Sequence, residues 1–383
     1  MRAGLLGRKL GHSLSPQIHK FFGDYEYRLY ERGPEEVEAF LRGGFAAGDF
    51  DFLNVTIPYK QMVFALCDEL SPMARKLGNV NFVTRTEDGK LRGDNTDAFG
   101  VERLLDSVGS DVHGQNCAIL GAGGAAMTVK AVLEERGAKR VTFIRRGEMP
   151  AQDDQLIVNA TPVGMWPNAD DVRVNIAEFP NCEVVLDLVY NPSPTRLVRE
   201  ARACGKTAAD GMVMLIAQAY RAFRLAVRTG DGRPETLFLY GPPASGKSTW
   251  AKKIAAATGW RLVDLDAEIV KAAGRSIPEI FAAEGEKGFR AIEKRELARI
   301  CACETPVTQG RVVALGGGAL LDDECLRMAE ASGRVVVLDC DLETLKSRLT
   351  GGDRPLSTDV KKLEALIAAR AAHYSSFARH VRM

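Results

Sequence analysis

Apolar runs followed by a turn and a helical stretch recur along the chain. Residues 116–120, 236–240 and 334–338 each have the composition of a short buried strand, and a helix-like stretch begins soon after each of them. Apolar strands that alternate with helices are typical of parallel sheets in α/β proteins. The pattern therefore predicts an α/β fold in both halves of the chain.

A polar segment separates the two halves. Residues 228–235 contain two glycines and one proline, which is typical of a linker. A glycine-rich loop lies on each side of this segment, at residues 121–125 and 241–248. Two such loops so far apart indicate two separate nucleotide sites, not an internal repeat.

Composition and charge limit the kinds of partner. A chain of 383 residues exceeds the usual size of one domain, and its 46% apolar and 26% charged residues are ordinary for a soluble globular protein. The formal net charge of +1 gives no overall field that would attract nucleic acid or an acidic membrane. The chain has no apolar signal core and no apolar run of membrane-spanning length, and its 8 cysteines are scattered, as expected of reduced thiols. We expect a cytoplasmic protein that binds neither nucleic acid nor membrane, and the oligomeric state stays open.

The first glycine loop has the context of a dinucleotide site. It follows a strand and begins a helix, so its backbone N–H groups and the helix N-terminus can hold a pyrophosphate. Read alone, the loop is also compatible with a tight turn between a closely packed strand and helix. The next strand ends in Arg145 and Arg146, where an NAD site usually has an acidic residue. Arginines suit the 2′-phosphate of NADP, unless they are simply solvated residues of a turn.

Four polar patches in the N-terminal part carry candidate chemistry. They are Gly11–Pro16, Asn54–Lys60, Gly78–Asn81 and Gly93–Asp97. Separately, Lys60 could be a surface lysine and Asp97 a helix N-cap. Together, hydroxyls, amides, a lysine and a carboxylate suit a small polyhydroxylated acid. A Lys60–Asp97 pair could exchange a proton with a carbonyl oxygen while a hydride arrives from the cofactor.

Six ordered motifs carry a family resemblance. They are H-S-x-S-P, N-V-T-x-P-x-K, G-D-N-T-D, G-A-G-G-A, N-A-T-P-x-G-M at residues 159–165 and D-G-M-x-M-L-x-x-Q at residues 210–218. In this order they resemble shikimate dehydrogenases over nearly all of residues 1–228. The resemblance implies reduction of 3-dehydroshikimate to shikimate with NADPH.

The resemblance also implies roles for individual residues. Lys60 and Asp97 match the catalytic pair. Substrate contacts are matched by Ser13, Ser15, Thr56, Asn81, Asp97, Tyr190 and Gln218. Cofactor contacts are matched by Gly121, Ala122, Gly123, Gly124, Ala125, Arg146 and Gly211, to which the charge argument adds Arg145. Phe82 and Val213 depart from the family pattern, and residues 147–158 are too few for the extra helix and strand that relatives have there. NAD therefore stays an alternative to NADP as the cofactor. A quinate dehydrogenase that uses NAD stays an alternative to the shikimate dehydrogenase.

The second glycine loop satisfies G-x-x-x-x-G-K-[ST] between a strand and a helix. This motif predicts that the amides of the loop, with Ser245, Gly246 and Thr249, wrap the phosphates. Lys247 neutralises the transferring group, and Ser248 binds Mg²⁺. Asp264 and Asp266 end the next strand on the same face. One of these carboxylates could reach the metal's water shell and the other could orient a substrate hydroxyl.

The second half resembles shikimate kinases over about residues 236–380. The P-loop, D-x-D, G-E-x-x-F-R-x-x-E at residues 285–293, G-G-G, R-P-L and a late arginine before tyrosine carry this resemblance. It implies phosphorylation of shikimate to shikimate 3-phosphate with ATP and Mg²⁺. By the same resemblance, shikimate is bound by Asp266, Arg290, Gly317 and Arg370. Arg354 covers the phosphates as the lid arginine, and Ser248 with Asp264 serves the metal.

We therefore predict an α/β chain with four parts. A substrate-binding subdomain (1–100) and a Rossmann-like NADP subdomain (101–228) precede a linker (229–235) and a P-loop kinase domain with a parallel sheet (236–383). Kinase relatives continue past the position of Tyr374 with another strand and a closing helix, whereas this chain ends at Met383. A nucleotide-binding module with weak or no kinase activity therefore stays an alternative.

Overall fold

The computed structural model describes residues 1–227, 235–302, 310–341, 343–345 and 360–382. The chain divides into two compact units, one formed by the described residues up to 227 and the other by nearly all of those from 235 onward. The predicted linker lies, except for Glu235, outside the described residues, as does Arg354. Among the described residues, no helix is long and apolar enough to cross a membrane.

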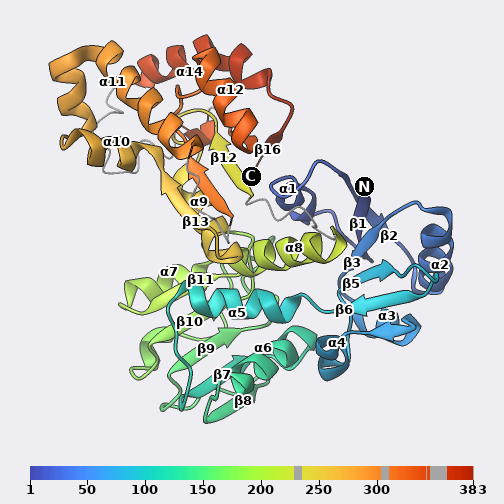
Figure 1. The fold of residues 1–383 in the computed structure, drawn as a ribbon. Helices are drawn as coiled ribbons and strands as arrows, with labels where there is room; N and C mark the ends of the chain where they lie inside the picture. The colour runs from blue at the N-terminus through green and yellow to red at the C-terminus, as the bar shows by residue number, and fades with distance from the viewer. Residues whose placement is uncertain (228–234, 303–309, 342, 346–359, 383) are drawn as a thin grey trace. The chain divides into compact units, whose positions relative to one another are not determined.

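The first sheet of the first unit is mixed. Its order is β2-β1-β3-β5-β6-β4, with β1 parallel to β2 and β3, and β5 antiparallel to β3 and β6 (Figure 1). The strands are β1 (Arg2–Gly7), β2 (Glu26–Glu31), β3 (Phe52–Val55), β4 (Glu69–Leu70), β5 (Phe82–Arg85) and β6 (Leu91–Asp94). The helices are α1 (Ser15–His19), η1 (Pro34–Glu36), α2 (Val37–Ala47), α3 (Lys60–Leu66) and α4 (Pro72–Leu77). Leu6, Leu53 and Val55 pack with Leu41 and Phe45 of α2 in the core.

The second sheet of this unit is wholly parallel, in the order β11-β10-β9-β7-β8. Its strands are β7 (Asn116–Leu120), β8 (Arg140–Ile144), β9 (Leu156–Asn159), β10 (Val184–Asp187) and β11 (Thr207–Asp210). The helices are α5 (Asp97–Ser107), α6 (Gly124–Glu135), η2 (Ile176–Glu178), α7 (Arg196–Ala203) and α8 (Met212–Ala226). This is the predicted Rossmann-like arrangement, because each parallel strand is followed by a crossover that returns over a face of the sheet.

Helices α5 and α8 lie side by side and join the two sheets (Figure 1). Gly100 permits this approach, since a Cβ there would lie 2.8 Å from Cγ of Met214. Ala222 of α8 packs against Phe52 and Phe82 of the first sheet. The last helix of the unit therefore contributes to the core of the N-terminal sheet, where the catalytic pair is predicted.

The connection from β8 to β9 is short and contains no helix, as the sequence predicted. Arg140 of β8 holds it, because its Nη2 lies 2.6 Å from Oδ1 of Asp153 and 3.0 Å from Oδ1 of Asp154. The sheet is covered instead by a later segment, which buries Val174 and Ile176. These side chains belong to one core cluster with Ala118, Leu120, Ile144 and Ile157 of the strands.

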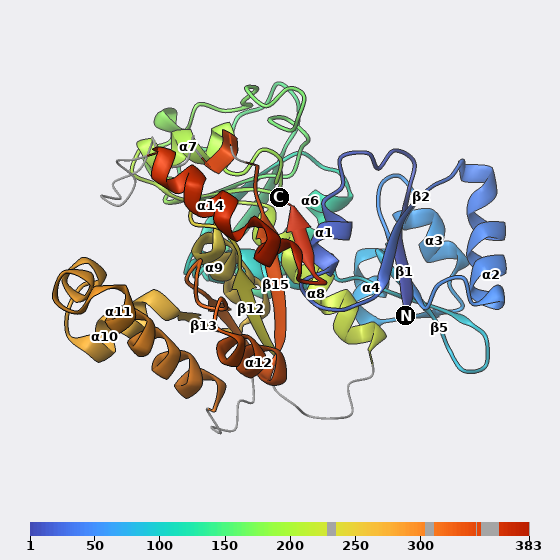
Figure 2. The same ribbon diagram turned by 90° about the horizontal axis from the view of Figure 1, so that it is seen from above.

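The second unit holds a wholly parallel sheet in the order β13-β14-β12-β15-β16. Its strands are β12 (Thr236–Tyr240), β13 (Arg261–Asp264), β14 (Arg311–Ala314), β15 (Arg334–Asp339) and β16 (His380–Arg382). Its helices are α9 (Lys247–Thr258), α10 (Leu265–Ala273), α11 (Ile277–Cys301), α12 (Asp323–Ser332) and α14 (Val360–Ser375); Figure 2 shows α10 and α11 alongside each other. The expectation that no strand follows Tyr374 was wrong, because His380–Arg382 pairs with β15.

Local sequence signals explain the ends of these helices. Ser276 and Glu279 form a capping box at the start of α11, with Pro278 in its first turn. Within α11 the backbone turns at Gly285, whose φ is 67°, in the left-handed region that glycine tolerates best. The two parts of α11 on either side of Gly285 therefore run in different directions, and Arg290 lies in the second part.

Candidate functional site

The predicted catalytic pair meets between two strand ends of the first sheet. Lys60 begins α3 just after β3, and Asp97 begins α5 just after β6. Nζ of Lys60 lies 2.5 Å from Oδ2 of Asp97. The Asp97 N–H donates to Oδ1 of Asn95, and the helix N-terminus favours the negative charge of its side chain. The sequence brings this pair together from positions 37 residues apart.

Carboxamides form the next wall of this site. Asn81 accepts from the Thr96 N–H at 2.7 Å, and its own Nδ2 donates to Oε1 of Gln218 at 3.3 Å. Because Thr96 precedes Asp97, these bonds fix Asn81 and Gln218 next to the Lys60–Asp97 pair. Asn79 and Asn95, which were not predicted as site residues, are also buried, and Nδ2 of Asn95 donates to Oδ1 of Asn79 at 2.7 Å.

Three of the predicted hydroxyl residues follow neighbouring strands of the first sheet, and the fourth follows a strand of the second sheet. Ser13 Oγ donates to Ser15 Oγ at 3.1 Å, in the segment that follows β1. Thr56 follows β3, which pairs with β1, and its N–H donates to the Leu6 carbonyl at 2.9 Å. Tyr190 lies between β10 and α7, where burial raises its pKa. These residues make no hydrogen bond to Lys60 or Asp97, so their predicted contact with a substrate stays a prediction.

A buried histidine supports the same region. Burial lowers the pKa of His19 to about 3, which keeps the imidazole neutral. Its ring stacks on Tyr27 with centroids 4.0 Å apart, and the Tyr27 hydroxyl donates to Oδ1 of Asn54. His19 is therefore a structural residue beneath the serine loop.

The first glycine loop leaves its amides accessible. Gly121 has a φ of 107°, and a Cβ on it would lie 2.9 Å from Cγ2 of Thr161. A Cβ on Gly123 or Gly124 would meet nothing within 4 Å, so space is open above the loop. Helix α6 begins there without a side-chain cap and without an acidic residue in its first turn. These features fit a pyrophosphate group held by backbone N–H donors.

Arg145 and Arg146 follow the strand next to this loop, whereas Gly211 follows β11 at the other edge of the sheet. Arg145 and Arg146 follow β8 and are exposed. Gly211 comes so close to the segment after β10 that a Cβ would lie 2.2 Å from the Leu188 carbonyl oxygen. Only glycine fits there, which gives a local reason for the D-G-M motif.

In the second unit, the phosphate loop has the features needed to receive phosphates. Lys247 Nζ donates to the carbonyls of Gly241 and Pro242 at 2.9 and 2.8 Å. Ser245 is buried, and its Oγ has no hydrogen-bond partner among the residues that the structure describes. A buried hydroxyl without a partner is costly, so this atom is a natural contact for a ligand.

Ser248 and Asp264, the predicted metal residues, are brought together. Ser248 Oγ donates to Oδ2 of Asp264 at 2.9 Å. The other carboxylate oxygen of Asp264 accepts from the N–H groups of Asp266 and Ala267 and so caps α10. Among the described residues, no group of three His, Cys, Asp or Glu side chains could hold a metal. A hydroxyl and one carboxylate suit Mg²⁺, which takes oxygen ligands and keeps several waters.

The predicted shikimate-binding residues of this unit converge on the G-G-G segment. The Gly317 carbonyl accepts from Nη1 of Arg370 at 3.2 Å and from the Tyr374 hydroxyl at 2.6 Å. A Cβ on Gly318 would lie 2.6 Å from Nη2 of Arg290, and one on Gly316 would lie 3.4 Å from Oδ1 of Asp266. Asp266, Arg290 and Arg370 therefore approach one glycine segment from three elements.

Glu293 is a further member of this group. Its carboxylate is buried and lies 2.5 Å from Nη1 of Arg290, and within the described part of the chain its Oε1 has no hydrogen-bond partner. Burial raises its pKa, and Arg290 opposes that effect. The G-E-x-x-F-R-x-x-E motif contains Glu293, but its spacing alone did not distinguish a site residue from an exposed helix position.

Comparison with known proteins decides the family of the first unit. A shikimate dehydrogenase (NADP(+)) of Methanopyrus kandleri is 37% identical over 267 residues, which cover 60% of this chain and 91% of that protein. The chain belongs to the shikimate dehydrogenase family. The family model of the shikimate dehydrogenase substrate binding domain matches residues 5–83 of the chain. The family model of shikimate kinase matches residues 243–382.

Solved structures agree with this membership. The shikimate 5-dehydrogenase of Thermus thermophilus, in complex with NADP(H) and shikimate, has a TM-score of 0.54 at 32% identity and covers 60% of this chain and 94% of its own. A chorismate mutase/shikimate 5-dehydrogenase fusion protein from Clostridium acetobutylicum has a TM-score of 0.55 at 31% identity, covering 59% and 91%. The predicted family resemblance and the α/β fold class are therefore confirmed.

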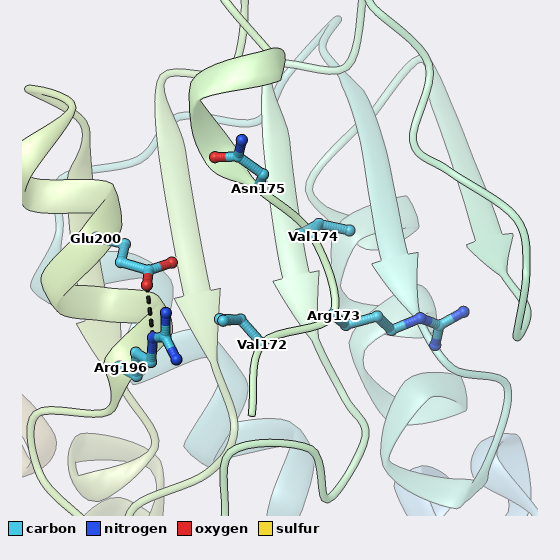
Figure 3. Close-up of a pocket in the computed structure, with 6 residues that line it drawn as sticks. All are labelled: Val172, Arg173, Val174, Asn175, Arg196 and Glu200. Carbon is cyan, nitrogen blue, oxygen red and sulfur yellow. Dashed lines mark hydrogen bonds and ion pairs between the residues drawn. The ribbon is translucent and has the colours of Figure 1, made fainter. Parts of the chain in front are cut away.

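This shikimate dehydrogenase family member also has a pocket that no predicted site residue lines. The pocket, of about 330 Å³, lies between the segment Val172–Asn175 and the start of α7 (Figure 3). Arg196 and Glu200 form one wall and are paired at 2.6 Å. Arg173 lines the same pocket, but its side chain extends away from that pair.

Proposed function

We propose that the first unit reduces 3-dehydroshikimate to shikimate with NADPH, and that the second unit phosphorylates shikimate to shikimate 3-phosphate with ATP and Mg²⁺. The observation that carries the first part is the 2.5 Å contact between Lys60 and Asp97 beside Asn81 and Gln218. Membership of the shikimate dehydrogenase family supports the substrate, and the NADP(+) in the name of the Methanopyrus relative supports the cofactor.

In the reduction, NADPH supplies the hydride that adds to the carbonyl carbon of 3-dehydroshikimate. Lys60 donates a proton to the carbonyl oxygen, which becomes a hydroxyl group. Asp97 orients the ammonium group and stabilises its charge between turnovers. Asn81 and Gln218, with Ser13, Ser15, Thr56 and Tyr190, bind the hydroxyl and carboxylate groups of the substrate.

In the phosphorylation, Asp266 orients the shikimate hydroxyl and accepts its proton. Lys247 and the loop amides neutralise the transferred phosphoryl group, and Ser248 with Asp264 would hold Mg²⁺. Arg290 and Arg370 bind the shikimate carboxylate, since guanidinium groups match a carboxylate with two hydrogen bonds. The convergence of Asp266, Arg290 and Arg370 on Gly316–Gly318 supports this part of the proposal.

One incubation tests both parts. The purified full chain is supplied with 3-dehydroshikimate, NADPH and Mg-ATP, and each product is identified by mass spectrometry. We expect shikimate when ATP is left out and shikimate 3-phosphate when it is present. Shikimate that accumulates without phosphorylation would instead favour a nucleotide-binding module without kinase activity. A parallel incubation with 3-dehydroquinate and NADH tests the other alternative: reduction there, and none of 3-dehydroshikimate, would favour a quinate dehydrogenase.

A further inference from the structure

Arg173 reaches the end of β8 from a distant part of the chain. Its Nη2 donates to the Ile144 carbonyl at 2.7 Å, and the N–H of Gly121 donates to the same oxygen at 2.9 Å. The guanidinium group therefore lies next to the first glycine of the loop that fits a pyrophosphate. Figure 3 shows the side chain running away from the Arg196–Glu200 pair.

The charge of Arg173 has no carboxylate partner within the described residues. Within the described residues, the guanidinium groups of Arg145 and Arg146 also have no carboxylate partner. The nearby Glu148 carboxylate accepts from the Arg145 backbone N–H at 2.7 Å. At the opposite end of β8, by contrast, Arg140 binds two aspartates. Three arginines that pair with no carboxylate of the described residues thus lie at one strand end, as expected of an anion site.

The shortened β8–β9 connection explains how Arg173 comes to this place. No helix follows β8, and the segment that covers the sheet instead passes the end of this strand. Val174, which follows Arg173, is buried in one cluster with Ile144. The backbone of Arg173 is therefore anchored beside β8, and its guanidinium group is oriented before any ligand binds.

We propose that Arg173 binds the 2′-phosphate of NADP together with Arg146, and so helps to select NADP over NAD. The inference rests on the proposed NADP-dependent reduction. The end of the second strand of a dinucleotide-binding fold is where the adenosine ribose lies. A 2′-phosphate accepts charge-assisted hydrogen bonds from guanidinium groups, whereas the 2′-hydroxyl of NAD gains little from them.

The test measures dissociation constants by calorimetry on the full chain, without turnover. The ligands are NADPH, NADH, adenosine 2′,5′-bisphosphate and adenosine 5′-monophosphate. Arg173→Gln is expected to raise the dissociation constants of NADPH and the bisphosphate by about tenfold or more. The dissociation constants of NADH and the monophosphate should stay unchanged. Arg173→Lys, which keeps the charge, should retain most of the preference. Arg196→Gln removes an arginine from the other wall of the same pocket and should change none of the four constants.

Two results would overturn the inference. One is an Arg173→Gln variant that binds NADPH as tightly as the unmodified chain. The other is an equal loss for NADPH and NADH, which would assign Arg173 a structural role only. Absence of 3-dehydroshikimate reduction with either nucleotide would instead count against the proposed function, and binding of adenosine 2′,5′-bisphosphate would still report on Arg173.

Discussion

Lys60 and Asp97 stand at the ends of two strands of one sheet, with Nζ and Oδ2 2.5 Å apart. The Asp97 side chain is 6% exposed and that of Lys60 is 24% exposed, so water reaches the pair chiefly from the lysine side. That is the side on which a substrate carbonyl can approach the ammonium group. The carboxylate behind it keeps the ammonium in place.

Lys60→Ala should therefore abolish most of the reductase activity and spare the kinase activity. Removal of a positioned general acid lowers kcat by about 10²–10⁴-fold. NADPH oxidation with 3-dehydroshikimate measures the first activity, and ADP release with added shikimate measures the second. Lys76→Ala is the matched control, because Lys76 is a surface lysine paired with Glu135, and both activities should be retained. Loss of both activities in Lys60→Ala would contradict the division of labour between the units.

Lys247→Ala should give the reverse result. The variant removes the ammonium group that lies over the phosphate loop, and loss of one such electrostatic contact costs about a hundredfold or more in rate. Lys252→Ala changes an exposed lysine on the same helix, so its ADP release should match that of the unmodified chain. A kinase rate that survives in Lys247→Ala would show that this loop does not hold the reacting phosphates.

The sequence predicted those parts of the two sites that consist of local motifs. Both glycine loops follow a strand and begin a helix, and this order can be read from neighbouring residues. The pairing of Lys60 with Asp97 was implied by the family resemblance, and in the structure both residues follow strands that end at one edge of the sheet.

Contacts that depend on how segments outside the motifs pack could not be predicted. Arg173 lies 29 residues from Ile144 and belongs to no motif, and its position depends on a sheet face that the missing helix leaves uncovered. The Asn79–Asn95 bond and the buried Oε1 of Glu293 likewise depend on packing. Strand β16 was missed because three residues are too few for an alternating pattern.

The stability of the β8–β9 connection should depend much more on Asp154 than on the adjacent Asp153. Asp154 is 1% exposed, and its Oδ2 accepts from the Ala151 N–H at 2.8 Å, while Asp153 is 59% exposed. Asp154→Ala removes a buried carboxylate together with its hydrogen bonds from the Ala151 N–H and from Arg140, and should lower the free energy of unfolding by roughly 1–3 kcal/mol. Asp153→Ala should leave the urea midpoint close to that of the unmodified chain. Equal midpoints for the two variants would show that the buried carboxylate does not hold this connection.

Asp187 should make the first unit less stable as the pH rises from about 4 to 6. This carboxyl is fully buried, and burial raises its pKa from 3.8 to about 6 in spite of hydrogen bonds from Thr195, Asn159 and the Val189 N–H. Between these two pKa values the folded chain keeps a proton that the unfolded chain releases. Its contribution to stability is therefore complete below pH 3.8 and is lost as the pH passes 6. The loss amounts to roughly 2–3 kcal/mol.

Asp187→Asn should remove this dependence, because the amide is neutral at every pH and can still accept from Asn159 and Val189. Urea titrations of the full chain at pH 4.5, 5.5, 6.5 and 7.5 measure the effect. Relative to Asp187→Asn, the unmodified chain and an exposed control, Asp170→Asn, should both lose stability as the pH rises. His19 acts in the opposite direction, since its pKa of about 3 makes folding less favourable as the pH falls below 6.5, but it is present in all three chains. The difference between Asp187→Asn and the control therefore isolates the carboxyl, and parallel pH curves would show that Asp187 stays ionised in the folded chain.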